Sequence, residues 1–314
     1  MSACKLTALI DMQNSQRQGI LFAIAAYVMW GIAPIYFKQL GQVPADEILM
    51  HRVIWSFWLV IAIVALQRNF GRVRALAKQP KNLMVLCFTS VVIAANWLIF
   101  IWAINNDYLL EASLGYYINP LLNVLLGVLF LGERLRKPQL LAVAVAATGV
   151  AIPLISHGNI PYVALALAGT FGIYGLLRKK LPVDASTGLL SETAVLMPFA
   201  LAYWVWFTDS PSANLMTNTT ELNLLLLAAG VVTTLPLLCF AAAASRIPLY
   251  MVGFIQYIGP SLMFVLAVGL YGEPLTDEKI ITFAFIWSAL AIFTWDLIRH
   301  ARRKRKARKA AAQA

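Results

Sequence analysis

Long apolar runs alternate with short polar breaks along the whole chain. Ten such runs follow one another, near 19–37, 46–66, 82–104, 109–131, 139–156, 160–177, 188–207, 222–244, 249–271 and 279–298. A helix of about 20 apolar residues crosses the hydrocarbon core of a bilayer. The pattern therefore predicts an all-α, polytopic membrane protein with ten transmembrane helices. The separation of the fifth and sixth spans depends on residues 156–159 alone.

The composition agrees with a chain surrounded by lipid. Of its 314 residues, 61% are hydrophobic and 12% are charged, whereas soluble domains have roughly 25% charged residues. Cys4, Cys87 and Cys239 show no C-x-x-C spacing, and no H-E-x-x-H, G-x-S-x-G or P-loop motif occurs. These motifs would mark metal, hydrolase or nucleotide sites. We therefore expect no catalytic residue, no metal and no cofactor.

Lysine and arginine are distributed unevenly between the two membrane faces. With ten spans, 22 of the 25 fall in the N-terminal segment, alternate loops and the C-terminal tail, and the other face holds only Lys38 and Lys279. By the positive-inside rule the rich face is cytoplasmic, which predicts cytoplasmic termini. The net charge of +11 then reflects membrane topology. We expect membrane lipid as a partner and no nucleic acid, and we interpret the basic tail as a topology anchor.

An internal repeat relates the two halves of the chain at one constant offset. Tyr-Ile-x-Pro and Gly-Glu-x-Leu motifs recur at the same separation in both copies, at 117–120 and 132–135 and again at 257–260 and 272–275. Each half holds five spans, and an odd number inverts the second half in the membrane. The sequence thus predicts inverted repeats at 17–157 and 158–298, with a cytoplasmic extension at 1–16 and a tail at 299–314. Inverted repeats are typical of secondary transporters with a site near the midplane.

Paired prolines lie in the middle of the fourth and ninth spans. Pro120 and Pro260 each remove a backbone donor and free the carbonyl four residues earlier, on Tyr116 and Gln256. Interrupted helices are tolerated in membranes where they line a cavity. We therefore expect interruptions at both prolines, and a role for them in coupling or gating.

Polar and aromatic side chains share faces of several predicted spans. Tyr116, Asn119 and Asn123 lie on one helical face, and Gln256, Gly259 and Met263 occupy the equivalent places in the second half. These groups either line a cavity or hold helices together. Deep tryptophans either stack on an aromatic or cationic solute or pack in the core. The predicted substrate-binding residues are Trp30, Asn96, Trp97, Tyr116, Tyr117, Asn119, Asn123, Gln256 and Tyr257.

Two charges lie inside predicted spans, at positions that the repeat makes equivalent. Intramembrane charges cost about 2.5–3.5 kcal/mol at the bilayer centre and are therefore functional candidates. Arg52 and Glu192 are predicted to act in coupling or gating, with Glu192 as the site of a proton or other cation. The alternative is that each side chain reaches the nearby interface.

Several segments resemble a known family of permeases. They are Ala26–Gly31, Pro44–Ile48, His51–Ser56, Leu110–Tyr116 and Gln256–Pro260, and they are similar to the EamA branch of the drug/metabolite transporter superfamily. The resemblance runs from about residue 17 to 298. It implies two inverted five-helix EamA repeats and a bacterial cytoplasmic (inner) membrane location. The N-terminal extension and the basic tail depart from the pattern.

Together these features favour a secondary transporter, not an enzyme. We expect it to move a small organic metabolite or drug-like solute across the cytoplasmic membrane by alternating access. Coupling to protons or another ion, and a homodimer, are compatible with this interpretation. The alternatives are a membrane-embedded enzyme acting on a lipid or polyprenyl substrate, for which Asp46 and Glu47 are the acidic pair, and a non-transporting membrane sensor.

Overall fold

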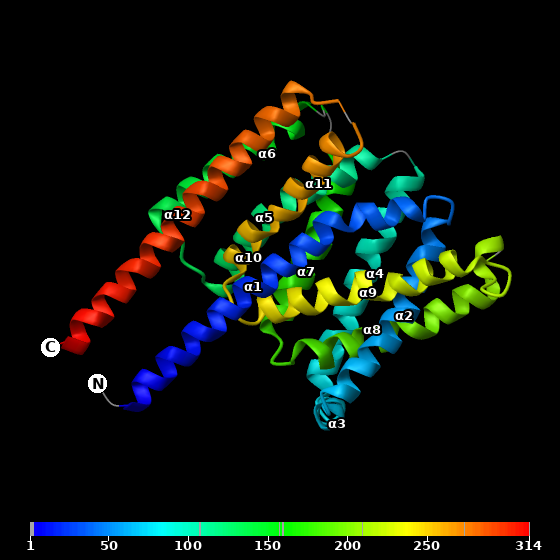
Figure 1. The fold of residues 1–314 in the computed structure, drawn as a ribbon, viewed down its shortest axis with the longest axis horizontal. Helices are drawn as coiled ribbons and strands as arrows, with labels where there is room; N and C mark the ends of the chain where they lie inside the picture. Colours follow the sequence, from blue (N-terminus) through cyan, green and yellow to red (C-terminus); the bar gives the residue numbers. More distant parts are fainter. Residues whose placement is uncertain are drawn as a thin grey trace.

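The computed structural model is a bundle of helices (Figure 1). It describes residues 3–106, 108–156, 158, 160–208, 210–272 and 274–313, and these contain no strand. Glu273 of the second repeated motif and His157 lie outside the described residues. The helices are α1 (Ala3–Gln39), α2 (Ala45–Leu66), α3 (Phe70–Ala77), α4 (Pro80–Asn105), α5 (Leu109–Leu131), α6 (Lys137–Ser156), α7 (Tyr162–Lys180), α8 (Ala185–Trp206), the 3-10 turn η1 (Pro211–Ala213), α9 (Thr220–Ala244), α10 (Leu249–Gln256), α11 (Ile258–Gly269) and α12 (Asp277–Gln313).

Nine helical segments of the described chain are long and apolar enough to cross a membrane, with α10 and α11 counted as one segment. The predicted tenth span is α7, whose last residues, Arg178, Lys179 and Lys180, make it less apolar. The predicted separation of the fifth and sixth spans is confirmed, because α6 ends at Ser156 and α7 begins at Tyr162. The all-α polytopic fold is therefore confirmed.

Polar caps and glycines define several helix ends. The Asp184 carboxylate accepts a hydrogen bond from the Thr187 backbone N–H at 3.0 Å and thereby caps α8. Burial alone would raise the pKa of the Asp184 carboxyl, but hydrogen bonds from Thr187 and Ser186 and the charge of Arg72 hold that pKa below its ordinary value. Gly132, with a φ of 63°, ends α5 in the left-handed conformation that glycine adopts most readily.

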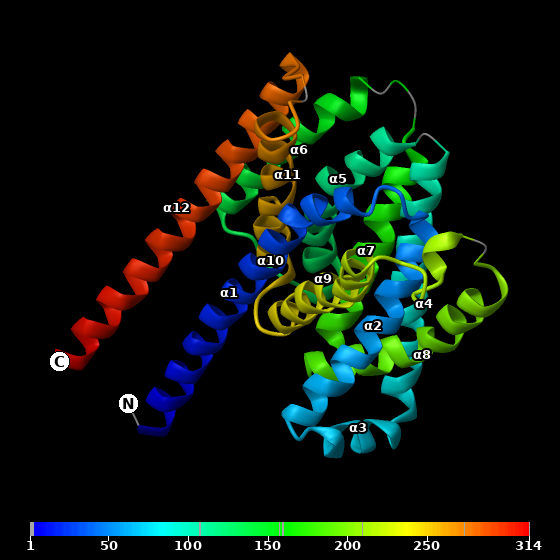
Figure 2. The same ribbon diagram turned by 45° about the vertical axis from the view of Figure 1, so that its right-hand side comes forward.

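The ends of the chain are more helical than the predicted domain limits suggest. α1 begins at Ala3 and α12 ends at Gln313, so residues 3–16 and 299–313 continue the first and last spans as helix. Neither stretch contains proline or glycine, and the tail is rich in alanine, lysine and arginine, which favour helix. Helix α3, in the basic loop after α2, was not predicted. Both chain ends lie on the same side of the bundle in Figures 1 and 2.

The two mid-span prolines have different effects on their helices. The ninth span is interrupted at Tyr257, between α10 and α11, as expected. The fourth span is not, because α5 is a continuous helix through Pro120, so that expectation was wrong. A single proline removes only one backbone hydrogen bond. In the ninth span Gly259 precedes Pro260 and weakens the helix further.

The helices pack in matched sets. α1 packs against α9, α10 and α11, while its counterpart in the second half, α7, packs against α4 and α5. Likewise α2 packs against α9, and its counterpart α8 packs against α4. The pairs α2–α8, α5–α10 and α6–α12 each join a helix to its own counterpart, and α6 and α12 run side by side along one edge (Figure 1). Most of the bundle interior therefore lies between the two halves.

Candidate functional site

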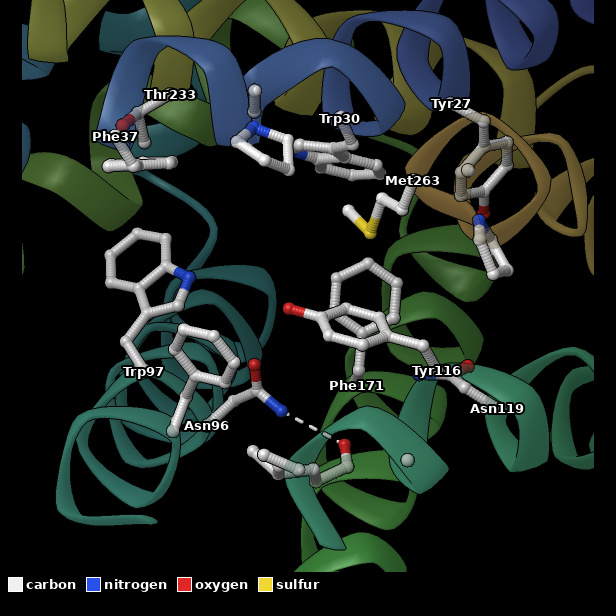
Figure 3. Close-up of a pocket in the computed structure, with 18 of the residues that line it drawn as sticks. Tyr27, Trp30, Phe37, Asn96, Trp97, Tyr116, Asn119, Phe171, Thr233 and Met263 are labelled. Atoms are coloured by element: carbon white, nitrogen blue, oxygen red, sulfur yellow. Dashed lines mark hydrogen bonds between the residues drawn. The ribbon is translucent and has the colours of Figure 1, made fainter. Parts of the chain in front are cut away.

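A cavity of about 450 Å³ lies between helices of the two halves. It falls in the size range of roughly 300–1,000 Å³ that is usual for small-molecule sites. α1, α2, α4 and α5 form one part of the wall, and α7, α9, α10 and α11 form the other. The predicted site residues that line it are Trp30, Arg52, Asn96, Trp97, Tyr116, Asn119, Gln256 and Pro260. Figure 3 labels five of them, Trp30, Asn96, Trp97, Tyr116 and Asn119.

Repeat-related residues from both halves meet at this cavity. Tyr116 and Asn119 come from α5, and their counterparts Gln256 and Gly259 come from the α10–α11 segment. Met263, one turn further along α11, also lines the wall. The structure thus brings most of the two predicted polar faces to one cavity.

The remaining predicted binding residues lie behind the wall. Asn123 is buried, and its amide donates to Oδ1 of Asn119 at 3.1 Å and to Oε1 of Gln256 at 2.7 Å. Tyr257 is buried as well, and its hydroxyl donates to the Tyr117 carbonyl at 3.3 Å. The Tyr117 ring packs against Phe283 of α12 at a centroid distance of 5.7 Å. Asn123, Tyr117 and Tyr257 hold helices together instead of contacting the cavity.

Pro120 also acts through packing. It is buried, and its carbonyl oxygen would lie 2.5 Å from a Cβ atom placed on Gly253 of α10. Only a glycine permits this approach, because any side chain at position 253 would overlap the Pro120 backbone. The close crossing of α5 and α10 therefore depends on the glycine at position 253, which faces the backbone of Pro120.

Arg52 is held at one end of the cavity. Its Nε donates to Oγ1 of Thr233 at 2.8 Å. Its Cζ lies 5.0 Å from the centroid of the Trp97 ring and 5.6 Å from that of Phe37, distances typical of cation–π contacts. The side chain faces the cavity, so the alternative that it reaches the lipid interface does not describe its position.

Aromatic rings form much of the remaining wall. Trp30 meets Phe171 edge-on at a centroid distance of 5.7 Å, and Phe100 meets Tyr116 at 6.2 Å. Trp30 also packs against Tyr27 at 5.5 Å, so it takes part both in the core and in the cavity wall. Such rings supply apolar contact area that varies little in shape.

Asn96 serves both of the roles considered for polar residues inside the spans. Its amide donates to the Leu167 carbonyl at 2.9 Å (Figure 3) and to Oγ1 of Thr170 at 2.8 Å, which ties α4 to α7. The same residue lines the cavity. Its donor group is therefore already occupied in this conformation.

Glu192 lies apart from Arg52, in a buried cluster that joins α4, α7 and α8. Its carboxylate accepts from Oγ1 of Thr89 at 2.7 Å and from the Tyr174 hydroxyl at 3.2 Å, and lies 3.8 Å from Nη1 of Arg178. The side chains of Arg178 and Glu192 are each only 2% exposed. The equivalence of Arg52 and Glu192 in the repeat therefore does not bring them to one site.

The acidic pair Asp46 and Glu47 contacts α8 and the connection that follows it. The Tyr203 hydroxyl donates to Asp46, and Oγ of Ser210 donates to Oε2 of Glu47 at 2.5 Å. Among the residues that the structure describes, no group of three or more His, Cys, Asp or Glu side chains is arranged to hold a metal ion.

Sequence reasoning missed several wall residues, including Phe37, Phe100, Phe171, Thr233 and Leu237. One of them carried a usable signal, since Leu237 is the counterpart of Trp97 in the internal repeat. The phenylalanines carried none, because an apolar residue within an apolar span gives no sign of facing a cavity.

Comparisons with known proteins agree with this architecture. The model of the EamA-like transporter family matches residues 17–155. An uncharacterized transporter of Vibrio cholerae is 58% identical, with 94% of this chain and 98% of that protein covered. Protein RarD of Salmonella typhimurium is 55% identical, with 92% and 98% covered. A crystal structure with 19% identity superposes with a TM-score of 0.70 over 87% of this chain and 96% of that one, which shows a shared fold.

The relatives are bacterial proteins, and this chain covers almost all of their length. The family and the names of these relatives point to a transporter rather than an enzyme. Their similarity covers both halves of the chain, although the family model matches the first half. With the many apolar helices, these findings identify a multi-pass protein of the bacterial inner membrane. The chain belongs to the EamA-like transporter family, as a RarD-like member of the drug/metabolite transporters.

Proposed function

We propose that this protein is a secondary transporter that moves a small organic solute across the inner membrane by alternating access. The observation that carries the proposal is the cavity of about 450 Å³ with walls from both halves of the chain. When two halves share one site, a rocking motion of one against the other exposes that site to each side in turn.

The matched packing of helices supports two inverted repeats, at 17–157 and 158–298. The contacts of α1 and α2 with helices of the second half have counterparts made by α7 and α8 with the first half. When one set of these contacts loosens and the equivalent set tightens, the protein changes from a state that is open to one side of the membrane to a state that is open to the other. Tyr116 with Gln256, and Asn119 with Gly259, are the equivalent positions at the cavity itself.

We further propose that both termini are cytoplasmic, from the distribution of basic residues. The cavity then lies toward the outer side, because Phe37 near the end of α1 and Ala45 at the start of α2 contribute to its wall. Its inner end is closed by the hydrogen bond from the Tyr27 hydroxyl to Gln256 and by the stacked rings of Tyr174 and Phe240. On this proposal the conformation faces outward.

Apart from Arg52, which lies at one end of the cavity, the predicted residues divide into two proposed roles. Trp30, Trp97, Tyr116, Asn119 and Gln256 contact the solute directly. A second set acts by positioning helices or by coupling and gating: Asn96, Tyr117, Pro120, Asn123, Glu192, Tyr257 and Pro260.

Transport by purified protein in liposomes tests this proposal. We expect uptake or counterflow of at least one member of a panel of anionic, neutral and cationic aromatic metabolites, measured with and without a proton gradient. Asn119→Ala removes a polar group from the cavity wall, and a lost hydrogen bond of about 0.5–1.5 kcal/mol predicts a roughly 2- to 10-fold loss of apparent affinity. Asn82→Ala, at an exposed contact near the start of α4, is the matched control. Absence of transport for the whole panel would contradict the proposal.

A further inference from the structure

The cavity carries one formal charge without a counter-ion. Among the described side chains that line it, Arg52 is the only one that is ionised at neutral pH. No described carboxylate forms an ion pair with it. The cavity wall is otherwise aromatic, aliphatic or neutral and polar.

The guanidinium of Arg52 is fixed, yet its binding edge is unused. Nε is bonded to Thr233 at 2.8 Å, and the guanidinium is flanked by Trp97 and Phe37. Neither terminal nitrogen donates to another described residue. These two nitrogens form the fork that binds a carboxylate with two parallel hydrogen bonds. The protein thus orients a cation and leaves its anion-binding face open.

The surroundings strengthen the attraction for an anion. Charges within an apolar bundle interact more strongly than in water, and an unpaired cation there is costly. The flanking aromatic rings offset part of that cost but supply no formal negative charge. An anion that enters the cavity supplies the negative charge that pairs with Arg52, whereas a cation is repelled by Arg52.

The rest of the cavity indicates what the anion is attached to. Phe37, Thr233 and Trp97, the partners of Arg52, lie together at one side of the cavity, and Tyr27 and Asn119 lie at the other (Figure 3). Between them stand the rings of Trp30, Phe171 and Tyr116. Flat apolar surfaces of this kind fit an aromatic body.

We propose that the solute is an organic monoanion, a carboxylate on an aromatic body, with the carboxylate bound to Arg52 and the body between Trp30, Phe171 and Tyr116. The proposal rests on the proposed function of the cavity and names its substrate class. One fixed cation matches one anionic group, and the volume of about 450 Å³ matches a small molecule.

Three ligands with one body and different head groups test the charge directly. They are 3-phenylpropionate, its neutral amide and the cation 3-phenylpropylamine. Each is added to the purified full-length protein in a neutral detergent, and the shift of the melting temperature is measured, since a ligand that binds only the folded state raises stability. We expect the carboxylate to bind about tenfold or more tightly than the amide, as charge-assisted hydrogen bonds predict, and the amine to give no shift.

Variants then assign the preference to Arg52. Arg52→Gln is expected to bind the carboxylate no better than the amide, and Arg52→Lys is expected to keep a reduced preference, because a point charge lacks the planar fork. Lys38→Gln is the matched control: Lys38 lies over the Tyr271 ring and does not line the cavity. If Arg52→Gln does not fold, the comparison of the three ligands on the natural protein and on Arg52→Lys still decides.

Several results would overturn the proposal. The first is a shift of the melting temperature with the amide or the amine that equals the shift with the carboxylate. The second is a preference for the carboxylate that persists in Arg52→Gln. The third is the absence of any shift at ligand concentrations of about 10 mM. The phosphate of an anionic lipid is another candidate source of the anion, and phosphatidylglycerol tests it. If this lipid raises the melting temperature only when Arg52 is present, and the carboxylate does not raise it, then the ligand of Arg52 is a lipid and not a solute.

Failure of this inference differs from failure of the proposed function. If neutral or cationic aromatic solutes are transported and the carboxylate is not, the proposed transport function is supported and the proposed anion site is wrong. If the carboxylate binds through Arg52 and no solute of the panel crosses the liposome membrane, the anion site is supported and the transport function is wrong.

Discussion

Arg52 and Arg178 both lie inside the helix bundle, and they differ in their partners. Arg178 is 2% exposed and pairs with Glu192, whose carboxylate also accepts from Thr89 and Tyr174. Arg52 faces the cavity and donates only to Thr233 among the described residues. The first arrangement resembles a structural ion pair, and the second matches the anion site that we propose for the cavity. Burial and partners, not charge alone, separate the two roles.

Breaking the buried pair is expected to destabilise the protein. Glu192→Gln leaves the Arg178 charge without its carboxylate, and the loss of one partner of a buried pair costs about 3–5 kcal/mol. The double variant with Arg178→Gln removes both charges and is expected to recover part of the loss. Thermal unfolding in detergent measures both, with Glu221→Gln at the exposed start of α9 as the control.

The same variant also tests the role that the sequence suggested for Glu192. If Glu192→Gln keeps the melting temperature of the natural protein but transports without dependence on a proton gradient, then Glu192 is a coupling residue and the structural interpretation is wrong.

At the scale of helices, small residues decide how closely α2 and α9 approach. The backbone of Gly230 lies so near α2 that an added Cβ would be 2.6 Å from the Trp55 backbone and Cβ and 2.9 Å from the Ser56 nitrogen. The Ser56 hydroxyl donates to the Gly230 carbonyl at 3.3 Å across this contact. Thr233, which holds Arg52, lies one turn further along α9. The contact therefore also sets the position of the cation in the cavity.

Gly230→Ala is expected to separate α2 from α9. The clash is with backbone atoms that cannot rotate away, and overpacking of this kind costs about 1–3 kcal/mol. A lower melting temperature in detergent and weaker binding of an anionic ligand are both expected. Gly169→Ala in α7 is the control, since nothing lies within 4 Å of the Cβ added there. Equal stability of the two variants would show that the α2–α9 contact is less tight than the structure indicates.

At the scale of the whole molecule, the distribution of basic residues predicts ten spans with both termini in the cytoplasm. A green fluorescent protein joined to the C-terminus is expected to fluoresce, because it folds on the cytoplasmic side where the basic segments lie. Alkaline phosphatase inserted in the connection at 208–219 is expected to be active, since that connection then faces outward. Activity of alkaline phosphatase joined to the C-terminus would contradict the cytoplasmic location of that terminus.

The sequence by itself determined the class of fold. Span length and apolar composition are local properties, so ten membrane helices, the α6–α7 separation and the family resemblance follow without tertiary contacts. The internal repeat also placed Tyr116, Asn119, Gln256 and Gly259 at equivalent positions, and these line the cavity.

Only the tertiary structure decided which side chains face the cavity. Helical periodicity assigns residues to a face, but it does not say whether that face meets a cavity or a neighbouring helix. Asn123 shares a face with Tyr116, yet the close crossing of α5 and α10 at Pro120 and Gly253 buries it. For the same reason Arg52 and Glu192, which the repeat makes equivalent, lie in different surroundings. Contacts between helices far apart in sequence pair Glu192 with the buried Arg178 and place Arg52 in the cavity wall.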